Sequence, residues 1–172
     1  MRTLFPYDRR VGSVRILPEW ISFAEAYARL VADRKGWPKP SPRDFAIKMG
    51  HLAFVAGFPV LHSGVSPDKS WADFKTLSSK KKIQVTTIPA DDKRTITPKI
   101  QLRLHVKWAM KSDIHVLAQC DPPFVDFIGY IYSKDLSSFR NSPQPWTSVP
   151  LEGLSPIIEL LQLMKQEQPV AE

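Results

Sequence analysis

Residues 71–87 combine two strand patterns with a lysine-rich turn, and no other segment of the chain constrains the fold as much. The stretch reads WADFKTLSSKKKIQVTT. Successive side chains of a strand point to opposite faces of a sheet, so Ile83 and Val85 can enter an apolar core. Gln84 and Thr86 then point together to the other face. The segment therefore predicts a hairpin with one buried face and one polar face.

Asp73 lies on the first of these two strands, where its carboxylate could face the polar pair Gln84 and Thr86. Magnesium prefers hard oxygen ligands, usually one or two carboxylates completed by water and phosphate. Asp73, the Gln84 carbonyl and a backbone carbonyl could make a weak site of this kind. An ordinary amphipathic hairpin with a solvated polar face would have the same spacing, so the pattern alone leaves both interpretations open.

The composition indicates a single globular domain that favours polyanions. A chain of 172 residues can bury a substantial core but is short for two domains. Hydrophobic residues make up 43% and charged residues 24%, as in ordinary globular proteins. Lysine and arginine total 24 against 17 acidic residues, and the formal charge of +7 favours nucleic acid as a partner.

The sequence also excludes several classes of protein. A single cysteine, Cys120, excludes an internal disulfide framework and a zinc site built from several cysteines. The first residues lack the apolar run of a signal peptide, and no stretch approaches the roughly 20 apolar residues that span a bilayer. We therefore expect an intracellular, cytoplasmic protein without a membrane partner.

Two amphipathic helices are predicted before the first strand. Apolar residues recur at helical spacing over residues 18–34, and Pro18 suits the first turn. Three prolines within residues 36–42 end that helix. Ser41 is a good N-cap for a second helix that runs to Gly57. The residues expected to face the core are Trp20, Phe23, Ala24, Tyr27, Leu30 and Val31 in the first helix, and Phe45, Met49, Leu52, Ala53 and Ala56 in the second.

The rest of the chain predicts mainly strands. Residues 114–118 and 124–131 are mostly apolar, which is typical of central strands covered on both faces. The other expected strands are residues 58–62, 72–75, 82–88 and 100–107. A short helix is expected from Ser133 to about residue 139, an irregular segment over 141–150, and a last apolar helix from Ser155. These elements predict an α/β or α+β fold, with a central mixed sheet of four to five strands flanked by helices.

Basic side chains gather at two places that could contact phosphates. On the predicted strand over residues 100–107, Arg103, His105 and Lys107 share the polar face. Same-face neighbours lie roughly 7 Å apart along a strand, comparable to the phosphate spacing of DNA. The turn of the hairpin adds Lys80, Lys81 and Lys82. Both the polar face of the strand and this turn could equally be solvated. Trp108 could either pack on the sheet or stack on a base.

The hairpin resembles the motif of the PD-(D/E)XK nuclease superfamily, in which an Asp precedes a Glu-x-Lys or Gln-x-Lys pair on the next strand. Here the Asp is Asp73 and the pair reads Gln84-Val85-Thr86. The resemblance is closest to intron-associated homing endonucleases and small restriction-type enzymes. It continues through the helix over 48–57, the strand over 111–119 and the strand-and-exit element over 124–136.

The resemblance implies one nuclease-like domain over residues 1–172. A restriction-endonuclease-like core would occupy residues 42–136. Residues 1–40 would form an N-terminal helical extension, and residues 137–172 a C-terminal wrap and helix. Small nucleases of this kind commonly act as dimers, and the apolar last helix with residues 139–146 offers a surface for a homodimer or a larger homo-oligomer.

The resemblance also implies a DNA endonuclease that depends on Mg²⁺ or Mn²⁺. Asp73 and Gln84 would hold the metal ion, and Thr86, which stands at the lysine position, could only hydrogen-bond the attacking water. Gly50-His51 stands where many members carry Gly-Glu, whose carboxylate joins the metal shell. A lysine from another element could replace the missing one, and the candidates are Lys48, Lys75, Lys82, Lys107 and Lys111.

Three functions are compatible with the sequence. The first is a DNA-binding endonuclease-like protein whose active site, formed by Asp73, Gln84 and Thr86, is atypical or incomplete. The second is a catalytically inactive nuclease-fold protein that serves as a DNA-binding or assembly subunit. The third is a basic interaction protein that matches the motif by chance.

Overall fold

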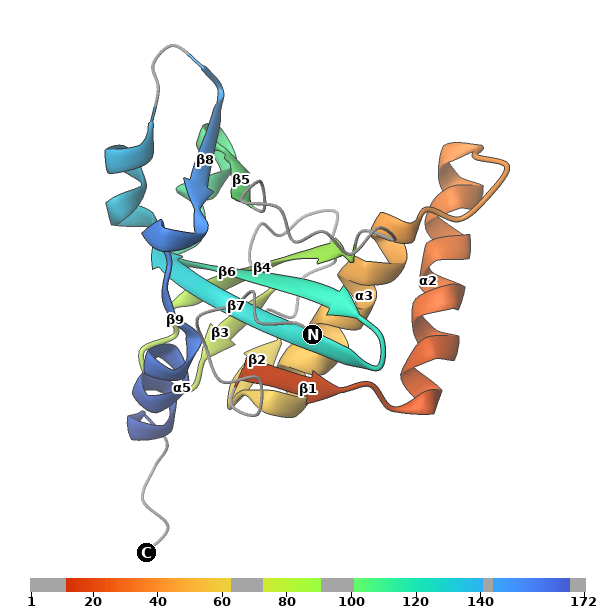
Figure 1. Ribbon diagram of the computed structural model, residues 1–172, viewed down its shortest axis with the longest axis horizontal. Helices are drawn as coiled ribbons and strands as arrows, with labels where there is room; N and C mark the ends of the chain where they lie inside the picture. Colours follow the sequence, from red (N-terminus) through yellow and green to blue (C-terminus); the bar gives the residue numbers. More distant parts are fainter. Residues whose placement is uncertain (1–11, 63–72, 91–100, 141–143, 168–172) are drawn as a thin grey trace, which may run out of the picture.

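The computed structural model describes residues 12–62, 73–90, 101–140 and 144–167, in which a mixed sheet is covered by helices and by a two-stranded ribbon (Figure 1). The predicted strand positions Ala72 and Ile100 and residues 141–143 lie outside these ranges. No helix in the described ranges is long and apolar enough to cross a membrane. The helices are α2 (Pro18–Lys35), α3 (Pro42–Gly57), α4 (Val106–Ala109) and α5 (Ile157–Gln166), with the 3-10 helices η1 (Ser133–Phe139) and η2 (Leu151–Gly153).

The main sheet has the strand order β1-β7-β6-β4-β3-β2, and β9 pairs with β7. β4 and β6 are parallel, while β7 runs antiparallel to β6 and β3 antiparallel to β4. The strands are β1 (Ser13–Arg15), β2 (Val60–His62), β3 (Phe74–Thr76), β4 (Lys82–Pro89), β6 (Ile114–Asp121), β7 (Phe124–Tyr132) and β9 (Ser155–Pro156). The predicted mixed sheet is thus confirmed. It has seven strands in the described ranges, because β1 and β9 are too short to show a sequence pattern.

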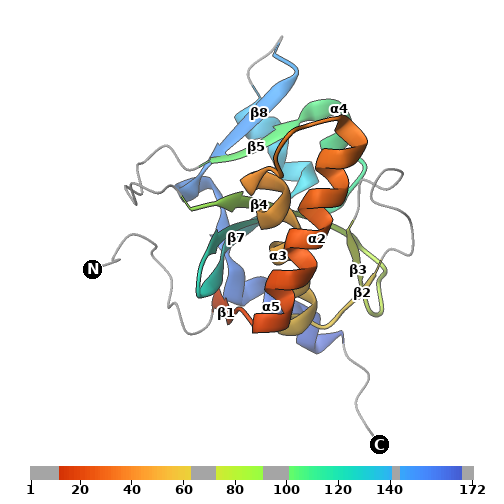
Figure 2. The same cartoon turned by 90° about the vertical axis from the view of Figure 1, so that its right-hand side faces the viewer.

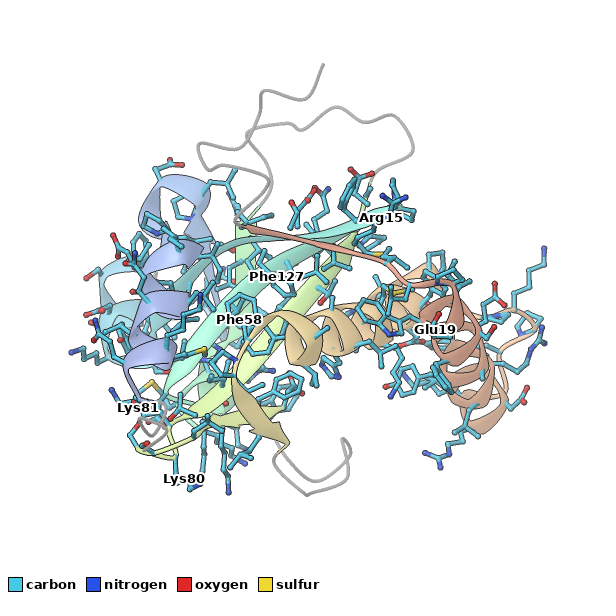
Figure 3. All side chains as sticks on the ribbon, turned by 90° about the horizontal axis from the view of Figure 1, so that it is seen from below. Arg15, Glu19, Phe58, Lys80, Lys81 and Phe127 are labelled. Carbon is cyan, nitrogen blue, oxygen red and sulfur yellow. The ribbon has the colours of Figure 1, made fainter. Side chains whose placement is uncertain are left out.

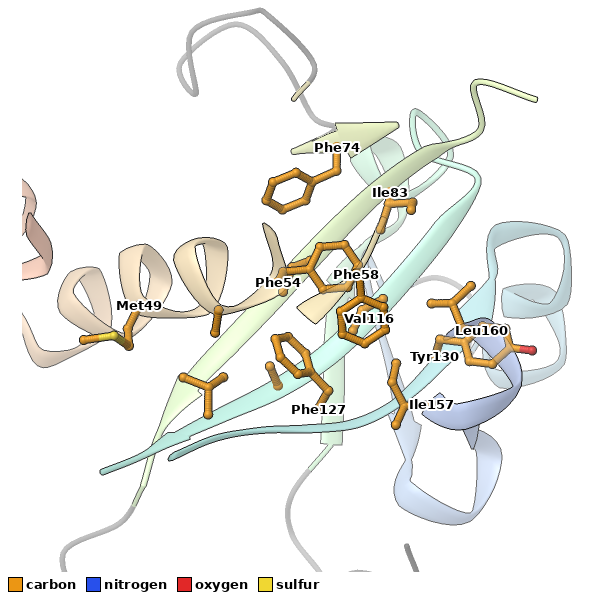
Figure 4. Packing of buried hydrophobic residues seen from close by; sticks show 14 of the residues in the cluster. Met49, Phe54, Phe58, Phe74, Ile83, Val116, Phe127, Tyr130, Ile157 and Leu160 are labelled. Carbon is orange, nitrogen blue, oxygen red and sulfur yellow. The ribbon is translucent and has the colours of Figure 1, made fainter. Parts of the chain in front are cut away.

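Aromatic rings form the core between α3 and the sheet (Figure 4). The ring centroid of Phe54 on α3 lies 4.4 Å from that of Phe58 and 5.0 Å from that of Phe74. Phe127 of β7 lies 5.2 Å from Phe58, and Figure 3 shows these two rings between α3 and the sheet. The same cluster includes α5, whose apolar face was predicted, through Ile157, Leu160 and Met164.

α2 packs on α3 rather than on the sheet (Figure 2), and its buried face agrees with the prediction at Ala24 but not at the larger residues Phe23 and Leu30. The buried residues of α2 are Ala24, Ala28 and Ala32, which recur every four positions. Phe23 and Leu30, which were predicted to face the core, are 56% and 48% exposed. Small side chains let two helices approach closely, so the alanine stripe lies at the contact with α3, and Tyr27 adds a ring under the Lys48 Nζ of α3.

The second face of the sheet is covered by the ribbon of β5 (Gln101–His105) and β8 (Trp146–Pro150). The prediction of an irregular segment over residues 141–150 was wrong for β8. Thr147 and Val149 are buried and alternate with exposed residues, which is the pattern of a half-buried strand. With Leu102, Leu104 and Leu117, Val149 belongs to a hydrophobic cluster separate from the one under α3.

α3 begins as predicted and lies unusually close to β4. The Ser41 Oγ accepts a hydrogen bond from the Arg43 N–H at 3.1 Å, which caps the helix. Gly50 faces β4 so closely that a Cβ added there would lie 1.8 Å from the Thr87 Oγ1. Only glycine fits this position, so Gly50 sets the distance between the helix and the sheet.

We predict that Gly50→Ala lowers the free energy of unfolding by about 3 kcal/mol, because the new methyl group overpacks a buried helix–strand contact. Gly36→Ala is the matched control. Gly36 has a φ of 68° and open space where its Cβ would be, so only the left-handed backbone is penalised, by about 1 kcal/mol. Urea unfolding of both variants measures the difference, and equal losses would contradict the close approach.

Candidate functional site

Asp73 lies immediately before β3 and bonds to β4 through both its backbone and its side chain. Its N–H donates to the Ile83 carbonyl oxygen at 2.9 Å. Its Oδ2 accepts a hydrogen bond from the Val85 N–H, also at 2.9 Å. The side chain is 19% exposed. Asp73 is therefore held firmly against β4, with part of its carboxylate open to solvent.

His51 of α3 completes this arrangement. Its Nε2 lies 3.2 Å from the Asp73 Oδ2, and its side chain is 22% exposed. The imidazole also meets the Phe74 ring edge-on, with the ring centroids 5.6 Å apart. Because Oδ2 is an acceptor, the Nε2 carries the proton, and Nδ1 is the nitrogen that can accept a proton when the ring is neutral. The pair is thus an imidazole oriented by a carboxylate.

Gln84 and Thr86 lie on the face of β4 that is turned away from α3. Residues Ile83, Val85 and Thr87 are buried toward α3, and Gln84 and Thr86, which alternate with them, are half-buried. The structure therefore brings Asp73 together with His51 of α3, the residue at the predicted Gly-Glu position, whereas Gln84 and Thr86 point away from α3.

The predicted magnesium shell of Asp73 and Gln84 stays a prediction, and the Asp73 carboxylate already has partners within the protein. Gln84 points to the face of β4 that is turned away from α3, whereas the Asp73 Oδ2 is shared by His51 of α3 and the Val85 N–H. Within the described ranges, no group of three or more histidine, cysteine or acidic side chains is placed to hold a metal ion. The chemistry that the pair itself offers is proton transfer at His51.

Two of the candidate replacement lysines lie on the Gln84 face. Lys75 and Lys82 are cross-strand partners on β3 and β4, and Lys82 alternates with Ile83 as Gln84 does. Lys48 lies one turn before His51 on α3, with its Nζ 5.7 Å from the centroid of the Tyr27 ring. Lys107 lies on α4, and Lys111 follows it closely in the chain. The structure thus places Lys75 and Lys82 on the opposite side of the sheet from α3 and His51.

The predicted phosphate contacts form two exposed groups. Lys80, Lys81 and Lys82 are exposed at the turn between β3 and β4, where Lys80 has a φ of 54° (Figure 3). The Ser79 Oγ, beside them, donates to the Glu167 Oε1 at 2.7 Å and so ties the turn to the end of α5. In the second group Arg103 and Lys107 are exposed, whereas His105 is half-buried among aromatic rings.

His115 of β6 is a buried polar residue that the sequence did not single out. Its Nε2 lies 2.8 Å from the Ala109 carbonyl oxygen and 2.9 Å from the Ser133 Oγ. The Ser133 Oγ is also within hydrogen-bond reach of the Ala109 and Ser112 carbonyl oxygens. Carbonyl oxygens only accept, so Nε2 and the hydroxyl are both donors here. The serine and histidine therefore fasten α4 and η1 to β6 and do not form a nucleophile–base pair.

The comparisons with known proteins give no assignment. No model of a known protein family matches the chain, and neither a curated protein nor a solved structure does so. The arrangement of the chain's own residues is therefore the basis for the function proposed below.

We predict a coupling free energy of about 1 kcal/mol between Asp73 and His51, because their polar atoms lie 3.2 Å apart in a partly buried site. Asp73→Asn and His51→Gln, singly and together, form the double-mutant cycle, read by urea unfolding. Asn keeps an acceptor for the Val85 N–H. Asp135→Asn, at an exposed position on η1, is the control and should show no coupling to His51. A coupling near zero for Asp73 would contradict the pair.

We predict that His115 makes the protein less stable in mild acid. Burial lowers the pKa of His115 below its ordinary value of 6.5. Below about pH 6.5 the unfolded chain binds a proton that the folded chain does not, so stability falls with decreasing pH, by at most about 1.4 kcal/mol per pH unit. His115→Gln should remove this part of the slope between pH 7 and 5 in urea titrations. An unchanged slope would show that His115 does not titrate as described.

Proposed function

We propose that this chain is a nucleic-acid-binding protein built on a nuclease-like core, with DNA as its ligand. The observation that carries the proposal is the gathering of lysines at one end of the sheet. β4 and β6 are parallel and start at the same end, where Lys82 and Asp113 exchange hydrogen bonds of 2.8 Å. β7 ends there too, since Tyr132 pairs with Ile114.

Three chain segments deliver lysines to this end. The β3–β4 turn, α4 before β6 and the start of η1 after β7 each carry exposed lysine. Lys81 and Lys134 come from two of these segments, and their Nζ atoms lie 5.7 and 5.3 Å from the centroid of the same Tyr132 ring. Lysines on separate elements that converge in this way can contact successive phosphates. We name this surface the basic end, and it consists of Lys80, Lys81, Lys82, Lys107 and Lys134.

The order of the elements supports the nuclease-like core. A helix, α3, precedes the first core strand, β2, and the hairpin of β3 and β4 follows. The next strand of the main sheet, β6, lies directly beside β4, as the resemblance implies for the strand next to the site. Asp73 stands immediately before β3, and its carboxylate accepts a hydrogen bond from the Val85 N–H of β4. These features agree with the PD-(D/E)XK resemblance without depending on its active-site lysine.

Binding is favoured over cleavage by the geometry around Asp73. Thr86 offers no charge, and Gln84 points to the face of β4 that is turned away from α3 and His51. Hydrolysis of a phosphodiester is the second candidate, and the observation that favours it is the orientation of His51 by Asp73 at 3.2 Å. A general base needs a positioned imidazole of this kind. Magnesium-dependent cleavage stays a prediction, to be tested beside binding.

Incubation with supercoiled plasmid separates the two candidates. We expect the protein to retard DNA in the presence of chelator and to leave the plasmid intact with Mg²⁺ or Mn²⁺. The Asp73→Ala variant, if it is folded to the same extent, should bind DNA as well as the unchanged protein. Metal-dependent nicking that Asp73→Ala abolishes would establish cleavage. Nicking that persists in chelator and is lost in His51→Gln would establish the metal-free alternative. Absence of any binding to DNA or RNA would reject the proposal.

We predict that replacing Lys80, Lys81 and Lys82 by Gln weakens DNA binding. The slope of log Kd against the logarithm of the salt concentration should fall by up to about three, one for each lost phosphate contact. The matched control replaces Arg29, Lys35 and Lys39, which are exposed on α2 and the segment after it. Both variants lose three positive charges. Fluorescence anisotropy over a salt series should show the loss only in the first, and equal losses would indicate a response to net charge alone.

A further inference from the structure

The ribbon of β5 and β8 presents a second, different surface. Leu102, Leu104 and Val149 fill its inner face and are buried. The residues that alternate with them lie on the outer face. There His105 pairs with Trp146, and Arg103 pairs with Ser148. The ribbon stands above the main sheet (Figure 1), so this outer face is turned away from the core.

Aromatic and cationic groups are stacked on this outer face. The His105 and Trp108 rings lie 4.5 Å apart with an interplanar angle of 31°. The Trp146 ring meets His105 edge-on at 5.1 Å. The Arg103 guanidinium lies over the Trp146 ring, 5.0 Å from its centroid. We name this group the aromatic platform, and it consists of Arg103, His105, Trp108 and Trp146.

The platform remains open to solvent although its members are held in place. Trp146 is 41% and Trp108 37% exposed. Their rings are oriented by His105 and Arg103 and by the backbone of the ribbon, so they need little reorganisation to accept a further flat group. Large exposed aromatic groups of this kind mark binding surfaces more often than isolated apolar residues do.

The chain segments that carry the platform hold basic but no acidic side chains. Residues 101–112 and 144–151, which carry the ribbon and α4, contain Arg103, Lys107 and Lys111 and no acidic residue. A ligand that suits the platform therefore combines flat aromatic groups with negative charge. Nucleic acid has both, in a repeating order that matches alternating aromatic and basic side chains.

We propose that the aromatic platform binds single-stranded nucleic acid, with bases stacked on Trp146 and Trp108 and phosphates held by Arg103 and Lys107. This inference rests on the function proposed above and assigns it a strand type. Bases in a duplex are stacked on one another and do not offer their faces, whereas the bases of a single strand do. An anionic lipid surface would also attract the lysines, but it has no flat group that would extend the stack.

The test is anisotropy of a labelled oligothymidylate of about 20 nucleotides, compared with a duplex of equal length. Trp146→Ala and Trp108→Ala should each weaken binding of the single strand by about 5- to 150-fold, as expected for the loss of one stacked base. Trp146→Phe should retain most of the affinity, because a ring is restored. Trp37→Ala is the matched control: Trp37 is 44% exposed and carries Lys35 over its ring, but it lies after α2.

The outcomes separate the two proposals. In one outcome, replacement of Lys80, Lys81 and Lys82 abolishes duplex binding, while neither tryptophan variant changes single-strand binding. This result would overturn the platform and leave the proposed function standing. Absence of binding to any nucleic acid would overturn both. Tryptophan-dependent binding to vesicles of anionic phospholipid, without binding to the oligonucleotide, would overturn the platform's assignment in favour of a membrane surface. Circular dichroism of each variant establishes that it is folded.

Discussion

The parallel pairing of β4 with β6 is the constraint on which most of this structure depends. Seven residue pairs join the two strands, from Ile83 with Ile114 to Pro89 with Cys120. Parallel neighbours cannot be joined by a tight turn, because the chain must return along the whole length of the strand. Here the return occupies residues 90–113 and contains β5 and α4. The described part of this return, β5 and α4, lies on the face opposite to α3, so the parallel pairing also gives the sheet its second covered face.

The position of the Asp73–His51 pair follows from the first covered face. Gly50 lets α3 approach β4 until helix and strand are in contact at Thr87. His51 is the next residue, and its short side chain reaches the carboxylate of Asp73 because the helix axis is so close. A side chain at position 50 would push the helix outward and separate the pair. The candidate site is thus a consequence of packing as well as of chemistry.

The elements that the sequence predicted well are those whose signal is local. The Ser41 cap and Gly57 define α3, and the alternation from Lys82 onward defines β4 within one residue of its observed end. The alternation also predicted correctly that Ile83 and Val85 are buried on one face of β4 and that Gln84 and Thr86 point to the other face. It could not show which face Asp73 would join, because that depends on the approach of a helix from about 20 residues earlier in the chain.

The elements that were predicted wrongly depend on distant partners. β8 pairs with β5, more than 40 residues earlier, and its five residues end in proline, so the short alternation of Thr147 and Val149 is a weak local strand signal. α2 buries alanines because it packs on another helix, a choice that the spacing of its larger residues does not reveal. The aromatic platform has the same origin. Trp146 and Arg103 become neighbours only when the ribbon closes.

The direction of the strands joins the two proposed binding surfaces. Because the return segment has to reach the start of β6, it delivers α4 to the end of the sheet where β4 also begins and β7 ends. His105, Lys107 and Trp108 therefore lie where the chain passes from the ribbon to the basic end. A strand of nucleic acid that follows the return segment would meet stacked rings first and lysines next. Lysines attract any polyanion, whereas rings select exposed bases, so the two surfaces would contribute different parts of the recognition.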